Sequence, residues 1–430
     1  MKLFLLFLTL FLSYQLSADI NLIKKENSDS NQTLLVIGGI HGNEPGGYFA
    51  ASVLATHYKI LSKNLWIIPN LNKESILANR RGIHGDMNRK FASIKKYDKD
   101  RKIVTEVKKI ILDPKVSLVL NLHDGHGFYR KKEQNSIFNP NAWGQTCVID
   151  QCKLNSTQPF NNLNDIALEV QKNINKKLLK KHHQFNVKNT HTKFKDEQMR
   201  LSLTYFAVKN NKPAFAIETS KSLSSVSQKV FYQLLAIEEF MKIMNIQYRR
   251  DFELSAKNIR KIISNYGTLA INHNILLNLC DIKKALSFIP LKSSKNDFKF
   301  SNPLGAVKKN RLGNFDVYIG NIKVTTLKPQ YFKMSAHCPQ YYKVLADKKL
   351  LSLQKTSEFE INDDFKVIKE KDIRVNIIGY AAKKQDNESD IFISKKDLVS
   401  KYAVDKADTT YRIEFYKENE FCSMLLVKFK

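Results

Sequence analysis

Short apolar runs alternate with amphipathic stretches over the first half of the chain, from residue 34 to about residue 245. Four apolar runs have the length and continuity of buried strands: LLVIGG (34–39), NLWIIPN (64–70), VSLVLNLH (116–123) and KPAFAIETS (212–220). Between them, apolar residues recur at helical spacing near residues 46–56, 98–112, 161–180 and 225–244. This alternation predicts an α/β domain built on a largely buried sheet.

The pattern changes after NIQYRRDFEL (245–254), where apolar and polar residues begin to alternate singly in short runs. FDVYIGNIKVTTL (315–327) and DIRVNIIGYAA (372–382) are examples, and turn residues separate such runs. A period of two is typical of half-exposed strands. We therefore expect two small β-rich domains after the α/β domain of residues 19–249, one over 250–344 and a sandwich-like one over 345–430, with the boundary near VLADKK.

The first eighteen residues have the organisation of a secretory signal peptide. A lysine at position 2 precedes an apolar stretch, and the small residues Ser17 and Ala18 suit a cleavage site. We therefore expect residues 1–18 to be a signal peptide and the mature protein to be exported, which in a Gram-negative cell means the periplasm. The alternative is an uncleaved membrane anchor, because eighteen residues lie near the lower limit for a spanning helix. Either way, the folded part lies outside the cytoplasm.

The chain carries a formal net charge of +29. A basic protein in the cytoplasm would suggest nucleic acid as the partner, but export removes that partner. Anionic membrane surface and acidic cell-wall polymer remain. Lysine is spread along the whole chain without a single basic block, so much of this charge is expected to be solvated surface.

Five cysteines, at positions 147, 152, 280, 338 and 422, are too few and too scattered for a disulfide-stapled mini-domain. Cys147 and Cys152 are close enough in sequence to pair across a tight loop, or to remain free thiols. The odd count leaves at least one cysteine unpaired. None of the cysteines has the spacing of a cysteine-type zinc site.

Five of the fifteen glycines lie in one segment, IGGIHGNEPGG (37–47), directly after the first buried strand. Glycines allow a sharp strand-to-helix turn, and His41 and Glu44 lie three residues apart across it. Histidine nitrogen and glutamate oxygen are both common zinc ligands, so the two side chains are candidates for a metal site. The alternative is an ordinary helix start with Pro45 in its first turn.

Three further segments carry chemistry. NRRGIHGDMNRKF (79–91) concentrates Arg80, Arg81, Asn88 and Arg89 in one loop, which suits a carboxylate ligand, although it is also compatible with a basic surface loop. The strand VSLVLNLH ends in His123, and the strand PAFAIETS ends near Glu218. Side chains at the carboxyl ends of strands face the crevice in which α/β proteins bind ligands. A structural strand-end histidine, or His126 as the metal ligand, are the alternatives.

In chain order, this combination resembles the zinc carboxypeptidase superfamily, especially its branch with succinylglutamate desuccinylase and aspartoacylase. The resemblance covers roughly residues 30–245 and implies a mixed central sheet. A closer resemblance is to the exported DL-carboxypeptidases that determine cell shape in helical and curved Gram-negative bacteria. It includes the segments FNPNAWGQ (138–145) and AIETSKSL (216–223) and the two β-rich domains behind the catalytic one. Some members have Gln at the first ligand position, whereas this chain has His41.

The resemblance implies a role for each matching residue. His41, Glu44 and His123 would bind one Zn²⁺, whose fourth position stays open for water. Glu218 would be the general base, and Arg81 would stabilise the oxyanion. Asn88 and Arg89 would hold the terminal carboxylate of the substrate. A looser match gives Tyr205 as a substrate-closing tyrosine.

The resemblance also implies the reaction: removal of the terminal meso-diaminopimelate (mDAP) from the peptidoglycan tripeptide L-Ala-γ-D-Glu-mDAP. Trp143, Gln145 and residues 195–200 are candidates for contacts with the far, charged end of mDAP, or for a structural loop. The alternatives are an N-acyl amino acid deacylase of the aspartoacylase type and a non-catalytic wall-binding scaffold. The C-terminal domains are candidate binding modules for peptidoglycan or for cell-shape proteins.

Overall fold

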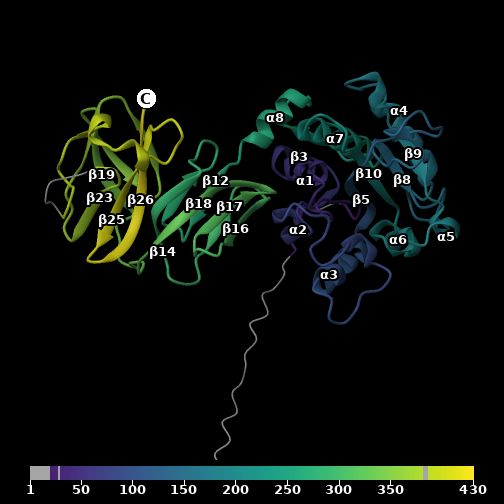
Figure 1. Cartoon of the computed structure of the whole chain (residues 1–430), viewed down its shortest axis with the longest axis horizontal. Helices are drawn as coiled ribbons and strands as arrows, with labels where there is room; N and C mark the ends of the chain where they lie inside the picture. Colours follow the sequence, from purple (N-terminus) through teal and green to yellow (C-terminus); the bar gives the residue numbers. More distant parts are fainter. Residues whose placement is uncertain (1–19, 28–29, 381–385) are drawn as a thin grey trace, which may run out of the picture.

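The computed structural model describes residues 20–27, 30–380 and 386–430. An α/β unit forms one end of an elongated molecule, and two β-rich units extend from it in succession (Figure 1). The expected signal peptide, residues 1–18, lies outside the described residues. No helix in the described part of the chain is long and apolar enough to cross a membrane.

A seven-stranded mixed sheet organises the α/β unit, in the order β1-β4-β2-β5-β10-β8-β9. Its strands are β1 (Ile23–Lys25), β2 (Thr33–Ile37), β4 (Asn64–Ile68), β5 (Val116–Gly125), β8 (Thr146–Ile149), β9 (Asn186–Asn189) and β10 (Ala214–Ser220). Strands β4, β2, β5 and β10 run parallel to one another, whereas β1 and β8 join antiparallel. The four central parallel strands are the four apolar runs that predict strands, so the mixed α/β fold is confirmed.

Most helices of this unit pack against the sheet, whereas the last one packs mainly on the helix before it. The longer ones are α1 (Pro45–His57), α3 (Arg101–Leu112), α4 (Leu163–Ile174), α7 (Val226–Ile243) and α8 (Ala256–Ser264). The shorter ones are α2 (Lys73–Leu77), α5 (Thr192–Lys195) and α6 (Leu203–Lys209), with single 3₁₀ turns η1 (Met87–Arg89), η2 (Lys181–His183) and η3 (Met199–Leu201). Val230, Leu234, Ile237 and Met241 recur at helical spacing in α7 and are all fully buried. Predicted helix ends differ by a few residues: α4, for example, stops at Ile174 rather than near residue 180.

Two small sheets make up the middle unit. One has the order β13-β12-β15 and the other β14-β18-β17-β16. The strands are β12 (Thr268–Ile271), β13 (Ile275–Asn278), β14 (Ala285–Leu291), β15 (Phe298–Phe300), β16 (Gly305–Lys309), β17 (Phe315–Ile319) and β18 (Ile322–Tyr331). Buried side chains of this unit, such as Leu269 and Val317, belong to the same continuous apolar core as the α/β unit.

The C-terminal unit has two four-stranded sheets, β20-β19-β22-β24 and β21-β26-β25-β23, and a separate apolar core. Its strands are β19 (Tyr341–Ala346), β20 (Lys349–Gln354), β21 (Glu358–Ile361), β22 (Asp364–Val367), β23 (Ile373–Ile377), β24 (Ile393–Ser394), β25 (Thr410–Lys417) and β26 (Glu420–Phe429), with 3₁₀ turns η4 (Lys395–Asp397) and η5 (Ser400–Tyr402). Two further pairs lie in the α/β unit: β3 (Tyr58–Ile60) with β11 (Tyr248–Arg250), and β6 (Phe128–Tyr129) with β7 (Phe138–Asn139).

Both predicted domain boundaries fall inside strands: 249/250 lies in β11 and 344/345 lies in β19. Because β19 pairs with β20 and β22 of the C-terminal unit, we propose that this unit begins before β19, between residues 331 and 341. Likewise, we propose that the middle unit begins after β11, which pairs with β3 of the α/β unit.

One disulfide joins Cys338 to Cys422. Cys147 and Cys152 are free thiols. Of the two alternatives that the sequence left open for them, the disulfide is therefore wrong. Cys147 is fully buried in β8, whereas Cys152 lies exposed beyond that strand, where its sulfur contacts the side-chain amide of Asn189. The disulfide ties the segment before β19 to β26 of the C-terminal unit.

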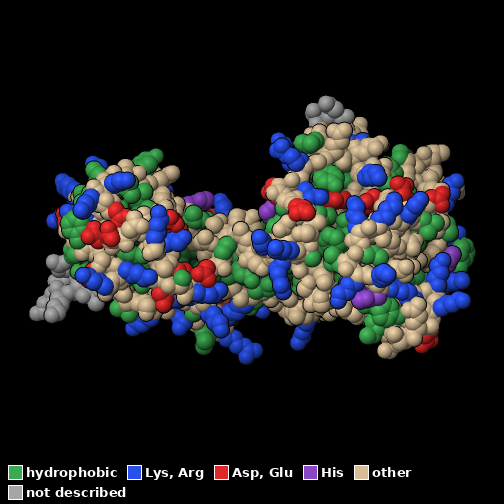
Figure 2. Space-filling model, turned by 90° about the horizontal axis from the view of Figure 1, so that it is seen from above, with side chains coloured by type: hydrophobic (Ala, Val, Ile, Leu, Met, Phe, Trp, Pro, Cys, Tyr) green, Lys and Arg blue, Asp and Glu red, His purple; other side chains and the backbone are tan. Residues whose placement is uncertain are grey.

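Basic side chains are spread out, rather than gathered in one patch, on the face of the molecule drawn in Figure 2. On the face seen in Figure 2, Lys and Arg occur over all three units, with Asp and Glu between them. This distribution agrees with the expectation that much of the charge is solvated surface.

Candidate active site

The glycine-rich segment turns the chain from β2 into α1 and brings His41 and Glu44 to the edge of the sheet. Gly42 is required by a close approach: a Cβ at this position would lie 2.0 Å from the backbone carbonyl carbon of Ser75 in α2. Glu44 occupies the N-cap position of α1, and Pro45 is in its first turn, but the Glu44 side chain makes no capping hydrogen bond. Its carboxylate points to two histidines instead, so the turn is more than an ordinary helix start.

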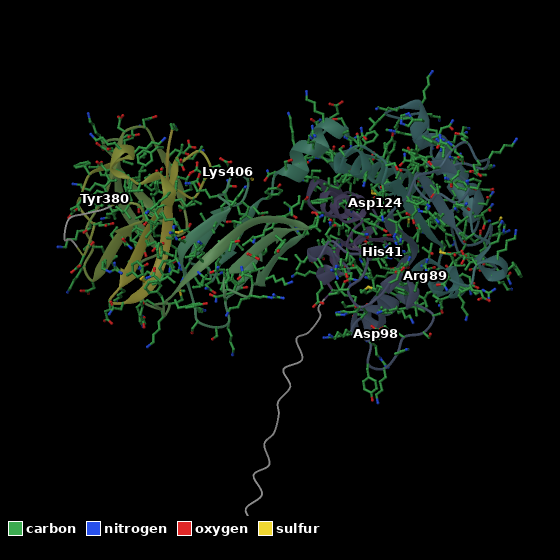
Figure 3. All side chains as sticks on the ribbon, viewed as in Figure 1. His41, Arg89, Asp98, Asp124, Tyr380 and Lys406 are labelled. Atoms are coloured by element: carbon green, nitrogen blue, oxygen red, sulfur yellow. A yellow bond between two sulfur atoms is a disulfide. The ribbon has the colours of Figure 1, made fainter. Side chains whose placement is uncertain are left out.

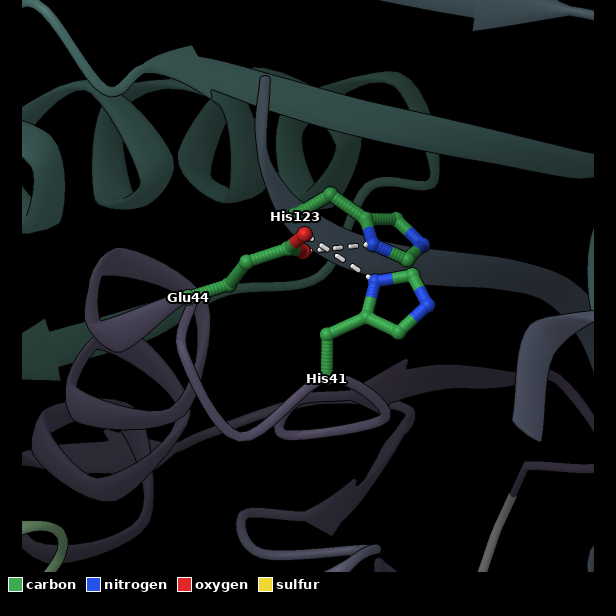
Figure 4. Close-up of side chains that lie close together, drawn as sticks. All are labelled: His41, Glu44 and His123. Atoms are coloured by element: carbon green, nitrogen blue, oxygen red, sulfur yellow. Dashed lines mark hydrogen bonds and ion pairs between the residues drawn. The ribbon is translucent and has the colours of Figure 1, made fainter. Parts of the chain in front are cut away.

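His41, Glu44 and His123 converge from two elements, the β2–α1 turn and the end of β5 (Figure 4). All three are buried, and one ligand atom from each lies within 4.8 Å of the others. The two oxygens of Glu44 lie 3.0 Å from Nδ1 of His41 and 2.9 Å from Nδ1 of His123. His126, the alternative ligand, is exposed and is not in this cluster.

The three residues fit a metal ion. Nδ1 of His41 is buried and has no assigned hydrogen-bond partner within the described part of the chain, although Oε1 of Glu44 lies 3.0 Å away. Burial lowers the pKa of His123, which favours the neutral imidazole that a metal requires. Burial alone would raise the pKa of Glu44, but the charge of His41 and the hydrogen bond with His123 hold it well below its ordinary value. Two imidazoles and one carboxylate are a common donor set for a catalytic divalent metal.

Asp86 supports this cluster, although sequence reasoning did not single it out. Its Oδ1 lies 2.8 Å from Nε2 of His41, and its Oδ2 accepts a hydrogen bond of 2.9 Å from Nε of Arg81. Burial by itself lowers the pKa of His41, but Glu44 and Asp86 raise it above its usual value. A carboxylate on the far nitrogen of a metal-binding histidine fixes its orientation. The signal was present in HGDMNR, an acid inside an otherwise basic loop.

Glu218 stands beside the histidine of the neighbouring strand. Strands β10 and β5 pair in parallel with Glu218 opposite His123, so the sheet register sets the relation between the two side chains. Removal of water from around its carboxyl group raises the pKa of Glu218 to about 8, and the nearby charge of Glu44 acts in the same direction. A carboxyl with a pKa close to neutrality suits proton transfer.

The basic loop lies against the same cavity. Arg81 is anchored by Asp86 and by Glu44, whose Oε1 is 3.2 Å from Nη1. Asn88 is buried, and its Oδ1 accepts a hydrogen bond from the backbone N–H of Leu203, which leaves its Nδ2 amide for a ligand. Arg89 donates from Nη1 to the carbonyl of Asn88. Arg89 and His41 line the same cavity, and their labels lie close together in the view of Figure 3.

One cavity of about 230 Å³ joins the predicted residues. Its lining includes His41, Glu44, Arg81, Asn88, Arg89, His123, Trp143 and Glu218, and also His126, Met199, Thr204 and Lys221. The structure thus brings together the metal, base and carboxylate candidates. Lys221 was not predicted; its Nζ lies 3.5 Å from Oε1 of Glu44.

The remaining candidates for substrate contacts differ in whether they reach the cavity. Trp143 lines the cavity, with Nζ of Lys188 4.3 Å from its ring centre. Gln145 is fully buried and uses its amide internally, donating to the carbonyl of His183, so its role is structural. Of residues 195–200, Met199 reaches the cavity. Tyr205 is not among the described residues that line it, although Thr204 on the same helix is, and the role of Tyr205 stays a prediction.

Comparisons with known proteins identify the family of the chain. Residues 1–264 match the family described as the catalytic part of carboxypeptidases controlling helical cell shape, and residues 335–430 match the C-terminal domain of metallo-carboxypeptidases. No curated protein sequence matches the chain.

Solved structures of the cell shape determinant protein Csd4 from Helicobacter pylori are similar over nearly the whole chain. The ligand-free form is 33% identical, covers 96% of this chain and 100% of that chain, and has a TM-score of 0.90. The tripeptide-bound form has the same identity and coverage and a TM-score of 0.89. The mDAP-bound form, described as a D,L-carboxypeptidase, is 33% identical, covers 95% of this chain and 100% of that chain, and has a TM-score of 0.90. The chain therefore belongs to the family of metallo-carboxypeptidases that control helical cell shape.

Proposed function

We propose that this carboxypeptidase is a zinc-dependent D,L-carboxypeptidase that releases mDAP from the peptidoglycan tripeptide L-Ala-γ-D-Glu-mDAP and leaves the dipeptide. The observation that carries the proposal is one cavity that is lined by the three candidate metal ligands, Glu218 and the basic loop. This cavity occurs in a chain that is 33% identical to Csd4 of Helicobacter pylori, whose structure has been solved with a tripeptide bound.

The proposed zinc ligands are His41, Glu44 and His123. A zinc ion bound by them would act as a Lewis acid on the scissile carbonyl and lower the pKa of a water molecule. Asp86 holds the ring of His41 in place through Nε2, 2.8 Å from its Oδ1. Because this contact orients the imidazole, Nδ1 faces the cluster.

Glu218 is the proposed general base. It takes a proton from the attacking water and delivers it to the amine of mDAP as the amide bond breaks. Glu218 on β10 is paired with His123 on β5, so its carboxyl group is close to the three proposed metal ligands. The parallel pairing of the two strands makes this placement rigid, which a proton-transfer group requires.

Arg81 is the proposed partner of the oxyanion that develops on the scissile carbonyl. Asp86 and Glu44 anchor its guanidinium at the wall of the cavity. The Nδ2 amide of Asn88 and the guanidinium of Arg89 are proposed to bind the terminal carboxylate of mDAP, for which planar N–H donors are well suited. Trp143 and Tyr205 are proposed contacts for the rest of the substrate.

A wall substrate also implies a place of action. We propose that the protein works in the periplasm and that residues 1–18 direct its export. Its binding partner is then peptidoglycan or its muropeptides rather than nucleic acid. The β-rich units are proposed sites for cell-shape proteins.

The test is mass spectrometry of the purified tripeptide after incubation with zinc-loaded protein. We expect release of mDAP, loss of the reaction with a chelator, and a decrease of about 10²- to 10⁴-fold in Glu218→Ala. Glu169→Gln, a change of an exposed carboxylate on α4, is the matched control and should keep full activity. An intact tripeptide with zinc-loaded protein, beside hydrolysis of N-acetyl-aspartate, would instead indicate a deacylase.

A further inference from the structure

A second cavity, of about 320 Å³, lies between the middle and C-terminal units, remote in the fold from the metal cluster. One wall is β14, and the other is formed by η5 and β25. Its lining is Ala285, Leu286, Ser287, Phe288, Lys401, Tyr402, Ala403 and Arg412. We call it the interdomain cleft. Nothing in the proposed reaction uses these residues.

Phe288 stands out in this cleft because its backbone is strained. Its φ angle is +60°, a left-handed conformation that a bulky side chain rarely adopts. The strand register explains the angle: Leu286 pairs with Leu327 and Ile289 with Pro329, so β14 has one more residue than β18 across this step. A β-bulge of this kind redirects a side chain, and Phe288 is left 50% exposed. Strain that presents an aromatic ring to solvent points to a binding role.

The bulge is held rigidly. Arg412, which is buried, reaches from β25 and donates to the carbonyls of Ser287 (2.8 Å) and Phe288 (3.2 Å). Glu414 balances its charge, with Oε1 3.1 Å from Nη1 of Arg412. Lys283 donates its backbone N–H to the carbonyl of Val404, which ties the two units together beside the cleft. The two walls are therefore preorganised, which reduces the entropy lost on binding.

A second aromatic ring faces Phe288. The ring of Tyr402 lies 6.4 Å from that of Phe288, between centres, at an interplanar angle of 45°. Nζ of Lys401 lies 4.8 Å from the centre of the Tyr402 ring. The cleft thus combines apolar ring faces with hydrogen-bond donors, and because Glu414 offsets Arg412, its charge is modest.

We propose that the interdomain cleft binds a neutral amino-sugar unit of the glycan strand. The apolar faces of a pyranose ring stack on aromatic rings, and its hydroxyl and acetamido groups accept hydrogen bonds from donors such as Lys401 and Ser287. This proposal rests on the proposed wall substrate, because the glycan strand is the polymer that carries the stem peptide. The cleft would hold the strand while the metal site trims its peptides.

The test uses the full zinc-loaded chain and a peptide-free probe, the β-1,4-linked tetramer of N-acetylglucosamine, in calorimetric titrations. We expect binding by the parent and at least about tenfold weaker binding by Phe288→Gly, a loss of about 1.4 kcal/mol. Glycine removes the ring and accepts the positive φ angle, so the fold is not put at risk. Tyr402→Ala should weaken binding similarly.

Phe392→Ala is the matched control, because Phe392 is also about half exposed, at 54%, and also has a lysine Nζ, from Lys366, 4.8 Å from its ring centre. It should bind like the parent. Absence of binding by the parent, unchanged binding by Phe288→Gly, or an equal loss in Phe392→Ala would overturn the proposal. Cleavage of the soluble tripeptide, measured in parallel, should be the same in Phe288→Gly and parent, so failure of the glycan site and failure of the proposed reaction remain distinguishable.

Discussion

Nε2 of His41 lies 2.8 Å from Oδ1 of Asp86, and this contact links the proposed metal site to the basic loop. The same carboxylate accepts from Nε of Arg81 and from the backbone N–H of Asn88, at 2.9 Å each. One acidic side chain therefore contacts a proposed metal ligand, the proposed oxyanion partner and the start of η1. It explains why so basic a loop contains an aspartate.

Replacing Asp86 should weaken metal binding without removing a ligand. In Asp86→Asn the carboxylate that orients His41 is lost, and a 10- to 100-fold lower zinc affinity is expected. Competition with a chromophoric chelator measures this affinity. Asp98→Asn is the control: Asp98 pairs with Lys90 in the same part of the chain and has no contact with His41 among the described residues. Equal affinities for Asp86→Asn and parent would show that Asp86 does not support the metal.

Zinc should stabilise the folded chain, and His123 should be required for it. A ligand that binds only the folded state adds about 2.7 kcal/mol at one hundred times its Kd, so the melting temperature of the metal-free protein should rise on addition of zinc. His123→Ala should abolish most of this rise. His126→Ala is the control, because His126 lines the same cavity but lies outside the ligand cluster. If His126→Ala were the variant without the rise, the ligand set would be wrong.

Glu218 should make the metal-free protein less stable as the pH rises. Its folded-state pKa is about 8, above the ordinary value of 4.5, because its carboxyl is shielded from water and faces Glu44. Between these two pH values the unfolded chain has released a proton that the folded chain retains, so the free energy of unfolding falls as the pH increases. Glu218→Gln cannot ionise and removes this loss.

The measurement compares melting temperatures of metal-free Glu218→Gln and parent protein. The difference, variant minus parent, should be larger near pH 8 than near pH 5, since the loss in the parent accumulates over that window. Glu169→Gln, on the exposed side of α4, should show no such trend. A difference that is independent of pH would mean that Glu218 is already ionised in the folded, metal-free protein.

Much of the site was predictable because it uses short-range patterns. The four central strands are continuous apolar runs, which are typical of strands buried on both faces of a parallel sheet. His41 and Glu44 are three residues apart, while His123 and Glu218 lie near the ends of predicted strands, and the parallel pairing of these strands sets the two residues side by side. Local sequence and sheet topology together were enough to bring these four residues to one place.

The missed features depend on contacts between distant segments. Cys338 and Cys422 are 84 residues apart, and their pairing requires the packing of the C-terminal unit to be known. Asp86 was missed because the surrounding arginines suggested only a basic loop, and its contact with His41 forms only when that loop folds against the β2–α1 turn. Arg412 resembles an ordinary strand residue in sequence, yet its guanidinium binds the carbonyls of a bulge in another unit.

The contact between the middle unit and α1 gives a last prediction. Gly320, in the turn between β17 and β18, has φ +58°, and a Cβ there would lie 3.0 Å from the ring of Tyr48, which is fully buried. Gly320→Ala should therefore suffer both the cost of a left-handed alanine, about 1–2 kcal/mol, and an overpacking cost of about 1–3 kcal/mol. Gly313→Ala isolates the first cost, because Gly313 has φ +79° and a Cβ added there would meet no heavy atom within 4 Å.

Thermal melting of the zinc-loaded proteins should show a larger decrease in melting temperature for Gly320→Ala than for Gly313→Ala. Tyr48 lies in the first turns of the helix that follows Glu44. The zinc affinity of Gly320→Ala should therefore also decrease. Equal decreases in the two variants would mean that a Cβ at Gly320 does not strain the contact with α1.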